Sequence, residues 1–101
     1  MKLKLTRIQF KAMYSLFQNL FVAVKPKEME AMLLHSILMG IVKKMYARDF
    51  EDRKKYSLTL TDAEAQAFCV FFTKYEMPIE LVYERNLILT ITNLINQKFA
   101  K

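Results

Sequence analysis

The chain has 101 residues, of which 53% are hydrophobic and 26% are charged, and its net charge is +6. This composition excludes intrinsic disorder and fits a single domain over residues 1–101. One Gly and one Cys exclude a glycine-rich phosphate loop, a disulfide framework and a multi-cysteine zinc site, so we expect no cofactor and no metal.

The N-terminal segment holds the whole excess of positive charge. Residues 1–27 carry six basic side chains and no acidic one, whereas the remaining 74 residues balance ten basic against ten acidic groups. Such asymmetry points to a nucleic acid or a membrane surface, or else to a solvated lysine-rich face.

The same segment has some features of a secretory signal, with lysines ahead of an apolar stretch. Ser15, Gln18 and Asn19 interrupt that stretch at the spacing of the polar side of an amphipathic helix. No apolar stretch reaches the ~18–20 residues that a membrane span needs. We therefore expect a cytoplasmic protein that does not bind membranes.

A short strand over Leu3–Leu5 precedes the first expected helix. Thr6 and Gln9 fit a capping box, in which each side chain accepts the backbone N–H of the other residue. A helix should follow to Val24. Its apolar side repeats at three- and four-residue spacing through Phe10, Met13, Phe17, Leu20 and Val24.

The second helix should begin at Pro26 and continue to about Tyr46. Proline is favoured at a first helical position, and Glu28 would then lie in the first turn. This helix is apolar nearly all round, which predicts burial on several sides, at the domain centre or in an oligomer interface. Its expected stripe comprises Met29, Met32, Leu33, Ile37, Ile41 and Met45, widened by Leu34, Leu38 and Val42.

The second half of the chain repeats this plan. A charge-dense link over 48–55 leads to a strand over Leu58–Leu60, and Thr61 with Glu64 forms a second capping box. A third helix is expected over Asp62–Tyr75. A fourth is expected over Pro78–Phe99, although its Leu87–Leu94 section is also compatible with a strand.

These elements predict an all-α or nearly all-α fold. We expect a four-helix domain made of two pseudo-repeated helical hairpins, over residues 2–47 and 57–100. Each hairpin follows a short β-segment, and the two segments can pair as a ribbon. Antiparallel pairing would place Ser57 near Thr6.

Residues suited to catalysis are scarce. His35 shares one side of its helix with Met32 and Met39, a set that could bind Cu(I), but a core histidine among packing methionines explains it better. Cys69 lies in an apolar run, which raises a thiol pKa and makes the group inert. We therefore predict no enzyme activity and identify no small-molecule substrate.

A basic patch is the candidate site for nucleic acid. If the strands pair, the basic run 53–55 approaches Arg7, and the patch could bind phosphates without sequence preference. Its members are Lys2, Lys4, Arg7, Lys11, Arg53, Lys54 and Lys55. No base-reading motif accompanies them.

The surplus of flexible hydrophobic side chains favours a different function. Seven Met, eight Phe and five Tyr in one small chain give more apolar surface than four short helices can hide. The leading hypothesis is a non-catalytic binding or assembly protein that works as a homodimer through its second or fourth helix, or with another protein partner. Non-specific nucleic-acid binding is the alternative.

Overall fold

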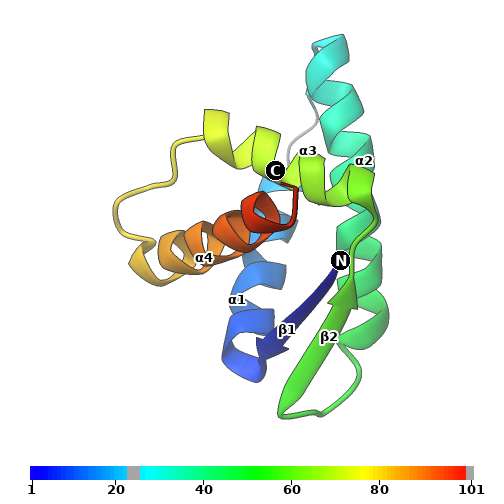
Figure 1. Ribbon diagram of the computed structural model, residues 1–101, viewed down its shortest axis with the longest axis vertical. Coiled ribbons are helices and arrows are strands. Elements are labelled where there is room, and N and C mark those ends of the chain that lie inside the picture. Colours follow the sequence, from blue (N-terminus) through cyan, green and yellow to red (C-terminus); the bar gives the residue numbers. More distant parts are fainter. Residues whose placement is uncertain (23–25, 100–101) are drawn as a thin grey trace.

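The computed structural model describes residues 1–22 and 26–99 (Figure 1). Within these ranges the chain is mostly helical and carries one two-stranded antiparallel sheet, as the sequence predicts. The elements are β1 (Lys2–Thr6), α1 (Arg7–Phe17), the π-helical turn η1 (Gln18–Val22), α2 (Met29–Arg48), β2 (Lys55–Thr59), α3 (Asp62–Lys74) and α4 (Val82–Phe99).

The ribbon of β1 and β2 joins the two halves of the chain. Lys55 lies opposite Thr6 and Ser57 opposite Lys4, so the expectation of Ser57 near Thr6 is wrong by two residues. A two-residue shift keeps the same side chains on each face, because strand side chains alternate with a period of two. The apolar face therefore still points inward, and its Tyr56 ring stacks on Phe10 of α1 with centroids 4.1 Å apart.

Both predicted capping boxes are confirmed. The backbone N–H of Gln9 donates to Thr6 Oγ1 over 3.2 Å, and the N–H of Thr6 donates to Gln9 Oε1 over 2.9 Å. The pair of Thr61 and Glu64 repeats this geometry at 3.1 and 2.8 Å. Each box satisfies two backbone donors that a bare helix end would leave unpaired.

The prolines do not begin helices, contrary to expectation. α2 begins at Met29 and α4 at Val82, three and four residues after Pro26 and Pro78. The acidic side chains in the first turns are accordingly Glu30 and Glu84. Residues 87–94 are helical throughout, so the alternative of a strand there is excluded.

The first helix ends differently from its prediction. Its last turn widens into the π-helical η1, and Phe21 is buried while Leu20 is only half-buried. The expected end at Val24 lies outside the described residues.

The core gathers around α1, which packs against α2, α4 and the ribbon. Phe17 is fully buried and has the rings of Phe21, Phe68 and Phe72 within 5.0–6.0 Å, so it ties α1 to α3. Leu38, Ile41, Val42 and Met45 of α2 and Leu87, Ile88, Ile91 and Ile95 of α4 close the core.

The division into two equivalent hairpins is not confirmed. α2 packs against α3 of the other half, α1 packs against α4, and the strands pair across the halves. The second half also has no π-helical turn in its described residues. None of the described helices combines the length and the apolar character needed to cross a membrane.

Candidate functional site

The ribbon brings the two basic segments together, as predicted. The backbone N–H of Arg7 donates to the carbonyl of Lys54 over 3.1 Å, and Arg7 Nε donates to the carbonyl of Arg53 over 3.1 Å. Lys2 and Lys4 are exposed on the outer face of β1, in line with this junction. The seven residues therefore lie on adjoining elements: β1, the start of α1, and the segment 53–55 that leads into β2.

Carboxylates of the 49–52 segment neutralise part of this surface. Lys11 Nζ lies 2.6 Å from Asp49, Arg53 Nε lies 2.9 Å from Glu51, and Arg7 pairs with Asp52.

The hydrogen bond that Lys11 donates to Asp49 raises the pKa of Lys11 above its usual 10.5. Lys2, Lys4, Lys54 and Lys55 have no ion pair with any residue that the structure describes. Four lysines of the patch are therefore available to bind a ligand, whereas Arg7, Lys11 and Arg53 are paired with carboxylates.

A second surface lies on α2, and here burial contradicts the sequence. Met29, Met32 and Leu33 were expected in the buried stripe, yet they are 82%, 48% and 62% exposed. The core takes up only the C-terminal half of the helix, from Leu38 onward. Figure 1 shows the N-terminal end of α2 extending beyond the other elements.

Between Leu33 and Tyr46 the same side of α2 carries the exposed Ser36 and Lys43 and the half-buried Met39, which packs against the core. At the C-terminal end, Tyr46 is 59% exposed and Phe50 is 77% exposed, and their rings meet edge to face at 5.6 Å. We call this row the outer stripe of α2; it consists of Met29, Met32, Leu33, Ser36, Met39, Lys43, Tyr46 and Phe50. The stripe lies on the side of the helix opposite Leu38, Ile41 and Met45, because residues turn by about 100° each.

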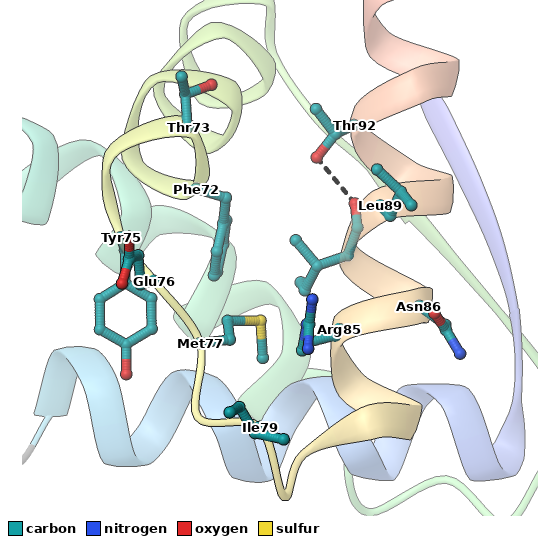
Figure 2. A pocket seen from close by; sticks show the side chains of 11 residues that line it. Phe72, Thr73, Tyr75, Glu76, Met77, Ile79, Arg85, Asn86, Leu89 and Thr92 are labelled. Atoms are coloured by element: carbon teal, nitrogen blue, oxygen red, sulfur yellow. Dashed lines mark hydrogen bonds between the residues drawn. The ribbon is translucent and has the colours of Figure 1, made fainter.

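A cavity of about 620 Å³ opens between the C-terminal end of α3 and α4. Figure 2 shows Phe72 from α3, Met77 from the connecting segment and Arg85 from α4 around it. Thr92 Oγ1 on its wall already donates to the carbonyl of Ile88 over 2.7 Å. The lining holds one cation, Arg85, and one carboxylate, Glu76, and its side chains do not form a nucleophile–base pair.

A second cavity, of about 520 Å³, lies beside η1 and the start of α2, with Leu34, Phe71 and Tyr75 in its walls. His35 also lines it and is half-buried, and its Nε2–H donates to the carbonyl of Phe21. The expected core histidine therefore lies half-buried at a cavity wall, with one ring nitrogen hydrogen-bonded.

The remaining candidates are the thiol of Cys69 and a metal site. Cys69 is half-buried, and burial raises the pKa of its thiol, in the direction predicted. Among the described residues, no three His, Cys, Asp or Glu side chains are grouped as a metal site would require.

Sequence analysis missed both cavities, because their walls come from separate segments whose positions no local pattern reveals. Comparison of the chain with protein families, with curated proteins and with solved structures finds no match. Functional inference therefore rests on the chain's own surfaces.

Proposed function

We propose that the protein is a non-catalytic binding or assembly protein that acts as a homo-oligomer. One observation carries this proposal: α2 keeps large apolar side chains exposed near both of its ends, on the side opposite the core. Exposed apolar patches beyond a few hundred Å² are typical of interaction surfaces.

The size of the uncovered surface supports the proposal. Five large side chains of the outer stripe are between 48% and 82% exposed. At about 200 Å² for each fully exposed large side chain, they offer on the order of 600 Å². A stable interface buries ~800 Å² per partner, so the five side chains supply most, but not all, of that area.

The fourth helix, the other candidate for pairing, is less suitable. Val82 and Leu89 are exposed on its outer side, but Asn86, Asn93 and Asn96 separate and flank them. Amide groups buried in an interface without partners would oppose association.

Size-exclusion chromatography with light scattering, over a concentration series, tests this proposal. We expect twice the chain mass of 12.0 kDa at micromolar concentration. Leu33→Glu should shift the equilibrium to monomer, whereas the control Ile8→Glu, at a residue 70% exposed on α1, should not. A monomer at every concentration would overturn the proposal.

Non-specific nucleic-acid binding is a second proposal, favoured by the four lysines that lack ion pairs. Lys2 and Lys4 lie on the ribbon, Lys54 contacts Arg7 and Lys55 follows it, so several of these cations could contact phosphates. The pairing of Arg7, Lys11 and Arg53 with carboxylates reduces the charge available for it.

Fluorescence anisotropy with duplex and single-stranded DNA, between 50 and 200 mM salt, tests this second proposal. Affinity should fall steeply with salt and be lost when the four lysines are replaced by Gln. A control with Lys43, Lys74 and Lys98 replaced by Gln changes the net charge by a similar amount elsewhere. No binding at 50 mM salt, or equal losses in both variants, would contradict it.

A further inference from the structure

The geometry points to an antiparallel pairing of α2 with α2 of a second copy, along the outer stripe. This inference rests on the proposed homo-oligomer and adds the partner's contact surface and orientation.

The spacing of the stripe is that of a helix-pairing seam. Met29, Met32, Ser36, Met39, Lys43, Tyr46 and Phe50 succeed one another at alternating intervals of three and four residues. This repeat of 3.5 residues keeps one row of side chains facing a neighbouring helix over several turns. The row spans the whole of α2, about 30 Å at 1.5 Å per residue.

The stripe also has the right residues for a close contact. Ser36 is small, so the backbones can approach near the middle of the row. Met29 and Met32 are exposed and flexible, so they can adapt to a second copy of the same surface, while the half-buried Met39 adds only its accessible part. A two-fold axis makes each copy offer the same patch, which a single self-complementary row satisfies.

Charge decides the orientation. A parallel pair would place Lys43 beside Lys43 of the second copy and Glu28 beside Glu28, and both contacts are repulsive. In an antiparallel pair centred near Met39, Lys43 instead faces the region of Ser36 of the second copy and Glu28 faces Phe50, so the like charges are kept apart. The opposed helix dipoles also favour this arrangement.

Position-specific disulfide trapping tests the orientation. All variants carry Cys69→Ala, which removes the protein's own thiol. An antiparallel axis near the middle of the stripe brings the two Met39 positions together and leaves the two Met29 positions about 30 Å apart. Under mild oxidation, Met39→Cys should therefore form a covalent dimer and Met29→Cys should not. Gln66→Cys, exposed on α3, controls for random collision.

The outcomes separate this inference from the proposal beneath it. Efficient crosslinking of both stripe variants would indicate parallel helices and overturn the orientation while leaving the homo-oligomer intact. A dimer by light scattering in which neither variant crosslinks above the Gln66→Cys level would show that another surface pairs. A monomer by light scattering would overturn both.

Discussion

Replacing Gly40 by Ala should destabilise the protein, although Ala is the better helix former. Gly40 lies inside α2, where α3 begins against it. A Cβ at this position would lie 2.6 Å from Glu64 Oε2, which is closer than real contacts allow. The carboxylate of Glu64 would have to move.

Movement of the Glu64 carboxylate would disrupt two interactions. Its Oε1 accepts the N–H of Thr61 over 2.8 Å in the capping box and lies 2.5 Å from Lys44 Nζ. Glu64 is only 7% exposed, so neither partner is replaced by water without cost.

The expected magnitude follows from these opposing effects. Gly→Ala in a helix interior gains about 1 kcal/mol from propensity. Disrupting the capping-box bond to the charged carboxylate costs about 1.5–2 kcal/mol. The ion pair with the more exposed Lys44 adds roughly 0.5–1 kcal/mol. The net result is a free energy of unfolding lower by about 1–2 kcal/mol.

Urea denaturation followed by circular dichroism, at one fixed protein concentration, measures this change. The same substitution in a Glu64→Ala background provides the control, because the obstructing carboxylate is gone. There, Gly40→Ala should stabilise by about 1 kcal/mol. Stabilisation by Gly40→Ala with Glu64 in place would refute the reasoning.

Three further predictions concern packing, reactivity and pH. Phe17→Ala should lower the free energy of unfolding by about 3–5 kcal/mol, because it removes the ring at the aromatic centre of the core. In the same urea assay, the exposed control Ile8→Ala should change the free energy of unfolding by less than about 0.5 kcal/mol. Cys69 should react with iodoacetamide more slowly than the urea-unfolded chain at pH 8, since its raised pKa reduces the thiolate fraction; equal rates would contradict this. The ion pair of Lys11 should stabilise the fold at neutral pH, and this effect should be lost as pH rises through the raised lysine pKa. Asp49→Asn should return that pKa toward 10.5 in an NMR titration. A lysine pKa that the substitution leaves unchanged would argue against the pair.

Local chemistry made the start of two helices predictable. The capping boxes of Thr6 and Thr61 depend on four consecutive residues each, and both form as expected. The prolines were misjudged by similar local reasoning. Pro26 and Pro78 are compatible with a first helical position but equally with a loop or turn ahead of a helix. The structure has the latter, and the N–H of Leu81 donates to the carbonyl of Pro78 across such a turn.

Features that depend on the path of distant segments were predictable only in part. Alternation in the strands fixed which side chains face inward, but no pattern distinguished two registers that differ by two residues. The approach of Arg53 to Arg7 followed from strand pairing alone. That Asp52 would turn toward Arg7 depends on the route of the chain between α2 and β2.

The burial of α2 was likewise predictable only in part. A helix that is apolar all round must be covered on more than one side, and the sequence indicates this. Which half leaves the core depends on where α3 crosses it. Met29 and Leu33 lie beyond that crossing, while Leu38 and Met45 lie within the core.

The ribbon has a consequence for how the chain emerges during synthesis. β1 is translated first, but its pairing partner β2 is about 50 residues further on. At about 5–20 residues per second, β1 waits roughly 3–10 s for that partner, whereas helices form within about a microsecond. Leu3 and Leu5 therefore remain without their strand partners long after α1 and α2 can form. The ribbon therefore joins the two halves only after the helices of the first half can form.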